Sequence, residues 1–373
     1  MNRKAMSEQD VRDVIGKFQI EGTFKSFCPI NDGHINCTYA VSFTQTGGDV
    51  KRYVLQAVNT SIFRNPVELI ENIRSVTEFL RKKIAAQGGD PERETLQLVP
   101  AADGKYYFEN EAGFWRVYRY IEGAVAYQSA EKPVLFRNSA VAFGRFQKLL
   151  ADYPAQTLHE TIPQFHDTPK RYRDFHAALA ADKAGRKKDV EKEIAFYLEH
   201  EKIADTITSK IATGEIPLRV THNDTKLNNI MMDAVTDEAV CVIDLDTVMP
   251  GSALYDFGDS IRFGASSGKE DEKDIDSIFM REDLFEAYTE GYLSQARDSL
   301  TEREISLLPM GAVLMTLECG LRFLTDYLDG DTYFAVHYPG QNLDRTRTQA
   351  KLVWDMERKY ARMEQIVARY AAK

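Results

Sequence analysis

The sequence has few cysteines, and none of them is placed to pair with another. Its 373 residues include four cysteines and no Cys-x-x-Cys pair: Cys28, Cys37, Cys241 and Cys319. Scattered thiols argue against a disulfide framework and against a zinc site, and they fit a reducing cell interior. We therefore expect a cytoplasmic protein.

Long apolar runs and an excess of positive charge are also missing. No stretch approaches the roughly 18 uncharged apolar residues of a membrane span, and the first ten residues lack the apolar centre of a signal peptide. Acidic residues outnumber basic ones by 57 to 47, which leaves a formal net charge of −10. We therefore expect neither nucleic acid nor a membrane as a partner. The net charge does not argue against a local pocket that binds one small anion.

The length and the residue pattern indicate two unequal parts. At about 100–200 residues per domain, the chain predicts two domains or one bilobal unit. Residues 1–122 show strand patterns and one helix, whereas residues 123–373 are mostly helical in pattern. The predicted fold class is α+β, with a small β-rich N-terminal lobe and a larger, mainly helical C-terminal lobe.

A hairpin and one helix stand out in the first part. Apolar residues alternate over residues 38–43, a turn with two glycines follows at 46–49, and a second strand is predicted over 53–58. Asn65 and Glu68 then predict a capping box at a helix start. The helix has one core face, made by residues at three- and four-residue spacing: Ile70, Ile73, Leu80 and Ile84. Further strands are predicted over residues 106–108 and 114–121.

The second part is helical except for one island. Helices are predicted over residues 134–150, 172–200 (one helix or a pair), 201–212, 284–293, 305–328 and 346–370. Residues 219–262 break this pattern, with a short apolar strand over 240–245 between two loops. Because functional residues concentrate in loops held by a rigid scaffold, we expect the chemistry there.

The island carries the pattern His-x-Asp-x-x-x-x-Asn, in which His222, Asp224 and Asn229 take the fixed positions. An apolar strand follows and ends in Asp-x-Asp at Asp244 and Asp246. Phosphoryl transfer from ATP needs a carboxylate near the attacking hydroxyl and oxygen ligands for Mg²⁺, which Asn and Asp supply. The pattern predicts a kinase that uses ATP and Mg²⁺.

These residues resemble the catalytic loop of the protein-kinase-like fold, in the form found in the aminoglycoside phosphotransferase and choline kinase family. The resemblance implies that Asp224 orients or deprotonates the acceptor hydroxyl and that Asn229 and Asp244 bind Mg²⁺. It implies that His222 braces the loop rather than transferring a proton, and that Asp256 ties the loop down. Asp246 is open to three interpretations: a second metal, the substrate, or a cap for the following turn.

The same resemblance places the nucleotide in the N-terminal lobe. Gly33 and Asn36 lie in a segment similar to the hairpin loop that covers the phosphates. Tyr120 and Glu122 fall where the family has the hinge whose backbone pairs with adenine.

One position departs from the general pattern. Gln56 stands where protein-kinase-like folds carry a strand lysine for the phosphates. Glu71 then resembles the usual helix partner of that lysine, and Arg64 is our candidate for the missing charge. The departure also raises a second hypothesis, a nucleotide-binding pseudokinase or regulatory module.

Longer runs resemble the N-acetylhexosamine 1-kinases, a branch of the family that also has Gln in place of the lysine. These runs include residues 244–251 and 321–328. The resemblance implies an amino sugar as substrate, phosphorylated on its anomeric hydroxyl, with Arg322 and Tyr333 as contacts. Arg322 has an equal alternative, an ion pair with Glu318 or Asp326 one helical turn away. A kinase of the same fold acting on homoserine, choline or an aminoglycoside remains an alternative, and the sequence does not indicate an oligomeric state.

Overall fold

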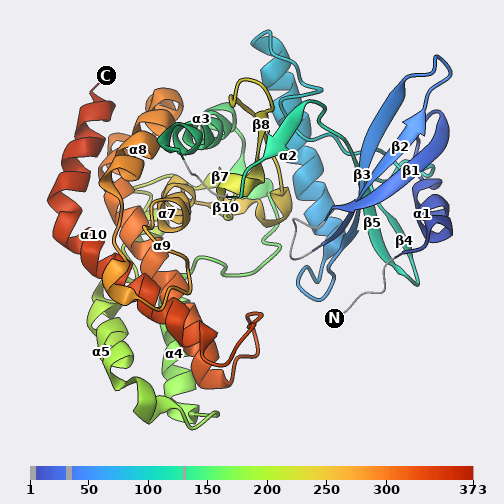
Figure 1. Cartoon of the computed structure of the whole chain (residues 1–373). Helices are drawn as coiled ribbons and strands as arrows, with labels where there is room; N and C mark the ends of the chain where they lie inside the picture. The colour runs from blue at the N-terminus through green and yellow to red at the C-terminus, as the bar shows by residue number, and fades with distance from the viewer. Residues whose placement is uncertain (1–5, 31–35, 129–131, 373) are drawn as a thin grey trace.

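The computed structural model describes residues 6–30, 36–128 and 132–372. An antiparallel sheet with two helices forms one lobe, and a helical bundle with short strands forms the other (Figure 1). This is the protein-kinase-like bilobal α+β fold that the sequence predicts. The boundary between residues 122 and 123 stays a prediction.

The N-terminal lobe holds a five-stranded sheet in the order β1-β2-β3-β5-β4. Its elements are α1 (Glu8–Ile15), β1 (Thr23–Ile30), β2 (Cys37–Thr44), β3 (Val50–Val58), α2 (Pro66–Ala86), β4 (Phe108–Asn110) and β5 (Gly113–Arg119). The predicted hairpin is confirmed as β2 and β3, and the predicted helix as α2. Helix α1 and strand β1 were not predicted, so the expectation of a single helix in this lobe was wrong.

Side chains of the sheet alternate between two cores. Val117 and Trp115 of β5 pack under α1, together with Leu55 of β3. Phe114 and Tyr118 face the other way, into the core that α2 shares with the helical lobe. Because strand side chains alternate in direction, Arg116, which lies between Phe114 and Tyr118, is also on the side of the sheet that faces α2. We call this side the inner face.

Helix α2 begins as predicted but without the predicted cap. Pro66 is the first helical residue, and Ile70, Ile73 and Ile84 are buried on the expected face. Asn65 makes no side-chain hydrogen bond to the helix backbone; its Nδ2 donates instead to Glu68 Oε2 at 3.1 Å. The capping-box prediction was therefore wrong, and the proline at the first position marks the start.

The C-terminal lobe is built on long helices. Its elements are β6 (Ala124–Ala126), α3 (Pro133–Leu149), α4 (Thr168–Ala181), α5 (Glu191–His200), α6 (Thr208–Ala212), β7 (Arg219–Thr221), β8 (Ile230–Asp233), β9 (Ala239–Val242), β10 (Met249–Gly251), α7 (Ala253–Gly264), α8 (Glu282–Ala296), α9 (Glu302–Asp329) and α10 (Gln341–Ala371). The long helices are confirmed. Residues 172–200 hold a helix pair, and the helix predicted over 201–212 shrinks to the five residues of α6.

Helix α9 is the apolar centre of this lobe. By length and composition it could cross a membrane, yet 83% of its most apolar window is buried inside the protein. Glu318 and Arg322 interrupt the apolar run, which is why the sequence shows no uncharged stretch of membrane length. Burial against α4, α7 and α10 accounts for its composition.

Helix α7 crosses α9 with almost no space between the backbones. A methyl group added at Gly258 would overlap the backbone carbonyl oxygen of Gly311, and one added at Gly311 would lie 2.7 Å from the carbonyl oxygen of Leu254. Only hydrogen fits at these two positions. The contact holds α7, which carries Asp256, firmly against the bundle.

We predict that Gly258→Ala destabilises the protein. Overpacking costs about 1–3 kcal/mol, which outweighs a gain of up to about 1 kcal/mol from the better helix propensity of alanine. Chemical denaturation should show a lower free energy of unfolding. Gly47→Ala is the matched control, because nothing lies within 4 Å of the added methyl group. Equal stability of the two variants would contradict the close crossing.

Candidate active site

A buried carboxylate on α7 fixes the loop that follows β7. Asp256 accepts hydrogen bonds from the backbone N–H groups of His222 at 2.9 Å and Asn223 at 2.8 Å. The side chain of Gln147 donates a third bond at 2.9 Å. Burial raises the pKa of Asp256, and the nearby His222 and these hydrogen bonds offset only part of that rise. The loop is thereby held with Asn223 in the left-handed region, at φ 65°.

Both ring nitrogens of His222 are occupied within the loop. Nε2 lies 2.8 Å from the carbonyl oxygen of Ile243, so it carries the hydrogen and donates. Nδ1 accepts from the backbone N–H of Asp224 at 3.3 Å. The ring is buried against the edges of Phe143 and Phe146. This geometry is that of a neutral brace and leaves no nitrogen free for proton transfer.

The Asp224 carboxylate is held by two neighbours from its own segment. Lys226 Nζ lies 2.7 Å from Oδ1, and Asn229 Nδ2 donates to Oδ2 at 3.0 Å. Burial alone would lower the pKa of Lys226, but Asp224 and Asp259 outweigh it and raise that pKa. Sequence reasoning missed Lys226; its place inside the motif, two residues after Asp224, was the available signal.

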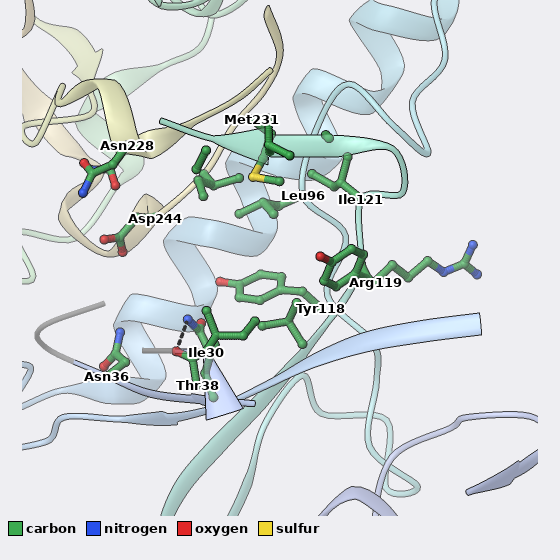
Figure 2. Close-up of a pocket in the computed structure, with 18 of the residues that line it drawn as sticks. Ile30, Asn36, Thr38, Leu96, Tyr118, Arg119, Ile121, Asn228, Met231 and Asp244 are labelled. Atoms are coloured by element: carbon green, nitrogen blue, oxygen red, sulfur yellow. Dashed lines mark hydrogen bonds between the residues drawn. The ribbon is translucent and has the colours of Figure 1, made fainter. Parts of the chain in front are cut away.

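Asp244 follows β9 in a left-handed conformation, at φ 57°. Burial raises its pKa to about 7, and the negative charges of Asp246 and Asp224 add to the effect. The side chain nevertheless faces the open space between the lobes, where solvent reaches it (Figure 2). The backbone N–H of Ile243 donates to the carbonyl oxygen of Asn229 at 2.9 Å, which joins the two segments.

A cavity of about 510 Å³ lies between the lobes. Its walls include six predicted site residues: Asn36, Gln56, Tyr120, Asp224, Asn229 and Asp244. Figure 2 shows Met231, Leu96 and Ile121 gathered on one side and Asp244 on the other. One end is therefore apolar and the other carries carboxylate and amide groups. Gly33 lies outside the described residues.

A polar network behind the cavity joins the lobes. Asp246 Oδ2 accepts from Asn36 Nδ2 at 2.7 Å, and Asp246 Oδ1 lies 2.5 Å from a terminal nitrogen of Arg116. Arg116 Nε donates to Gln56 Oε1 at 3.0 Å, and Gln56 Nε2 donates to Thr38 at 3.1 Å. Asp246 is thus a bridge between lobes. Sequence reasoning missed Arg116, whose only signal was a charge between apolar residues within a predicted strand.

Three other nucleotide-side candidates lie outside the walls of this cavity. Arg64 is exposed. Glu71 Oε2 pairs with His159 Nε2 at 2.9 Å. Glu122 accepts from Arg52 Nε at 3.0 Å, and that guanidinium stacks on the Tyr120 ring at 3.9 Å. The structure therefore does not bring Arg64 or Glu71 to Gln56.

The substrate candidates Arg322 and Tyr333 lie next to each other, apart from the walls of the main cavity. A terminal nitrogen of Arg322 donates to the Tyr333 hydroxyl at 3.4 Å. The guanidinium also lies 5.5 Å from the ring centre of Phe165 and 5.4 Å from that of Phe334. These rings and the cation form what we call the arginine–aromatic cluster.

The two carboxylates near Arg322 have other partners. Glu318 accepts from Thr168 at 2.6 Å and pairs with His166 at 2.8 Å. Asp326 accepts from backbone N–H groups of residues 332–334. In the described part of the chain neither carboxylate forms an ion pair with Arg322, so the ion-pair alternative was wrong.

Oxygen atoms for a divalent cation come from Asp244 and Asn229. Asn229 uses its amide nitrogen for Asp224, which leaves its amide oxygen for another partner. Among the described residues no group of three or more His, Cys, Asp or Glu side chains could enclose a metal. Mg²⁺ needs no such cage, because it keeps water and takes one or two carboxylates plus substrate phosphates. The donor set therefore fits Mg²⁺.

Comparison with known proteins agrees with this arrangement. A model of the phosphotransferase enzyme family (APH) matches residues 26–302. The aminoglycoside phosphotransferase from Alicyclobacillus acidocaldarius is 13% identical, with a TM-score of 0.58 over 99% of this chain and 98% of that one. Spectinomycin phosphotransferase bound to ADP and spectinomycin is 12% identical, with a TM-score of 0.57 over 95% and 99%.

A third similar structure is an amicoumacin kinase bound to AMP-PNP, Ca²⁺ and its substrate. It is 14% identical, with a TM-score of 0.55 over 98% of this chain and 94% of that one. At such identities the structures show the shared fold, whereas the family model covers most of the chain. The chain belongs to the phosphotransferase enzyme family and is a kinase-like phosphotransferase.

Proposed function

We propose that this phosphotransferase moves the terminal phosphate of ATP to the anomeric hydroxyl of an N-acetylhexosamine, GlcNAc or GalNAc, and forms the sugar 1-phosphate. The observation that carries the proposal is a single cavity that has an apolar end and a polar end. Asp224, Asn229 and Asp244 line the polar end. A planar base suits the apolar end, and phosphates with Mg²⁺ suit the polar end.

Adenine would occupy the apolar end. Val54, Leu96, Ile121 and Met231 line it, with Tyr120 at its edge. These residues come from both lobes, so a base bound there contacts both. The predicted hinge, Tyr120 and Glu122, connects the lobes beside this end.

Asp244 and Asn229 would hold Mg²⁺, which neutralises phosphate charge when bound. Without a cation, three carboxylates lie at this end, Asp224, Asp244 and Asp246, and in the described part of the chain Arg116 and Lys226 pair with two of them. The pKa of Asp244 is raised first by burial and then by the negative charges of Asp246 and Asp224. A divalent cation would relieve that repulsion.

Asp224 would accept a hydrogen bond from the attacking hydroxyl and take up its proton as the bond to phosphorus forms. Asn229 and Lys226 fix the orientation of the carboxylate, and its side chain keeps 26% of its surface exposed. Positioning and charge neutralisation, rather than covalent chemistry, would supply most of the rate gain.

The arginine–aromatic cluster supports a neutral acceptor. The Arg322 guanidinium lies beside aromatic rings and has donors for hydroxyl or acetyl oxygens, and Arg171 adds a second nearby guanidinium. These two cations would repel an ammonium group, although water screens part of the repulsion because Tyr333 is 69% exposed. This favours an N-acetylated sugar over choline, homoserine or an aminoglycoside.

Amine-bearing acceptors are the second candidate, since a microcompartment-associated aminopropanol kinase has a similar fold, at 16% identity and a TM-score of 0.53. ADP release measured with GlcNAc, GalNAc, homoserine, choline, aminopropanol and kanamycin separates the candidates. Turnover of the amines alone would overturn the sugar assignment. Nucleotide binding without any turnover would favour the pseudokinase hypothesis.

We predict that Asp224→Asn removes sugar-dependent ADP release. Asparagine keeps the size of the side chain but cannot accept the proton, so turnover should fall by about 10²–10⁴-fold. The melting temperature should stay close to that of the wild type. Asp298→Asn is the control, because that side chain is 82% exposed. Unchanged turnover in Asp224→Asn would sink the mechanism.

We predict that Asp244→Asn stabilises the metal-free protein more at pH 8 than at pH 5. The folded-state pKa of about 7 lies above the ordinary value of 3.8, so the destabilisation by Asp244 grows as the pH rises from about 4 and is complete above about 7. Thermal melts with EDTA test this, and added MgATP should then stabilise the wild type more. Asp237→Asn, also left-handed at φ 58°, controls for the backbone. An equal gain at both pH values would contradict the charge argument.

We predict that Arg322→Gln raises the KM for the sugar by about tenfold or more, the effect of losing a charged hydrogen bond. The KM for ATP should stay unchanged, because Arg322 lies apart from the main cavity. Steady-state kinetics check both values. Arg358→Gln, an exposed arginine stacked on Trp354, is the control. An equal rise in both KM values would contradict an acceptor contact.

A further inference from the structure

The position of Gln56 leaves the nucleotide phosphates without the strand lysine of protein-kinase-like folds. Of the described residues that line the main cavity, three are cationic: Arg116, Arg119 and Lys226. The partners and positions of these three residues show which of them can act on phosphates at the polar end.

Two of the three are committed elsewhere. Lys226 holds the Asp224 carboxylate at 2.7 Å. Arg119 is exposed and pairs with Glu92 outside the cavity, and Figure 2 shows its side chain extending away from Asp244. Arg116 also has a carboxylate partner, Asp246, but of the three cations it is the one that lies opposite Gln56 on the sheet.

Arg116 stands where the missing lysine would act. It lies on β5 directly opposite Gln56 of β3, on the inner face of the sheet. Its guanidinium reaches Asp246, two residues after Asp244, and so lies at the polar end of the cavity. The lysine position and Arg116 thus share one side of the same strand pair.

Burial makes this charge effective. The Arg116 side chain is 1% exposed, so water and salt screen it little, and it acts on anions in the adjacent cavity from within the wall. Gln56 suits this arrangement because its amide oxygen accepts from Arg116 Nε. A lysine at position 56 would instead place a like charge against the guanidinium.

We propose that Arg116 supplies the positive charge that holds the nucleotide phosphates, in place of a lysine at position 56. Asp246 and Gln56 fix the guanidinium in the wall, and Asn36 joins the same network from the start of β2. The inference rests on the proposed ATP-dependent activity and names the cation that this activity requires.

The alternative is that Arg116 only compensates the buried charge of Asp246. Removing Arg116 alone would leave that carboxylate unpaired and destabilise the protein for that reason. The double variant Arg116→Met/Asp246→Asn removes both charges together. It keeps an amide oxygen for Asn36 and separates folding from phosphate binding.

Calorimetric titration with MgATP, MgADP and adenosine tests the proposal on the wild type and the double variant. The double variant should bind adenosine like the wild type but bind ATP about tenfold to a hundredfold more weakly, with a smaller loss for ADP. Arg116→Lys should recover part of the loss, and Gln56→Lys should weaken ATP binding. Arg137→Met/Glu290→Gln, which neutralises an exposed ion pair, controls for the loss of one charge of each sign.

Three outcomes would overturn the proposal: wild-type ATP affinity in the double variant, an equal loss for adenosine and ATP, or a comparable loss in Arg64→Met instead. Failure of the wild type to bind any nucleotide would overturn the proposed function itself. The two failures are therefore distinguishable.

Discussion

The catalytic loop depends on one buried carboxylate. Asp256 receives two consecutive backbone N–H groups, from His222 and Asn223, and so holds a left-handed turn that the chain would otherwise avoid. The turn aims Asp224 into the cavity. Because α7 crosses α9 at Gly258 with no spare room, the anchor cannot drift. Helix packing therefore fixes the loop that carries Asp224, the residue proposed to take up the proton.

A second carboxylate, Asp246, joins the lobes rather than the loop. It meets Asn36 from the sheet edge and Arg116 from β5 within one network. A buried ion pair adds little net stability, because desolvation offsets the attraction, but it demands one geometry. The network therefore ties the segment after Asp244 in the C-terminal lobe to β5 and to Asn36 in the N-terminal lobe.

The shared chemistry of the family and the individual choice of acceptor occupy separate places. Asp224, Asn229 and Asp244 lie on the loop and strand end common to phosphoryl transfer. In the arginine–aromatic cluster, Arg322, Tyr333 and Phe334 come from α9 and the segment after it, beyond the residues that the family model matches, whereas Phe165 lies within that range. Acceptor preference can change there without disturbing the reaction.

The sequence by itself determined the elements and the motif. Apolar periodicity set β2, β3, α2 and the long helices, and the spacing from His222 to Asp244 marked the loop beside the cavity, whereas the metal ligands stay a prediction. Only the tertiary structure decided the partners: Arg116 rather than Arg64 beside Gln56, His159 rather than a strand residue beside Glu71, and no ion pair for Arg322. Periodicity records which face of an element is buried, whereas these pairs join residues 60 or more positions apart through strand register and helix packing.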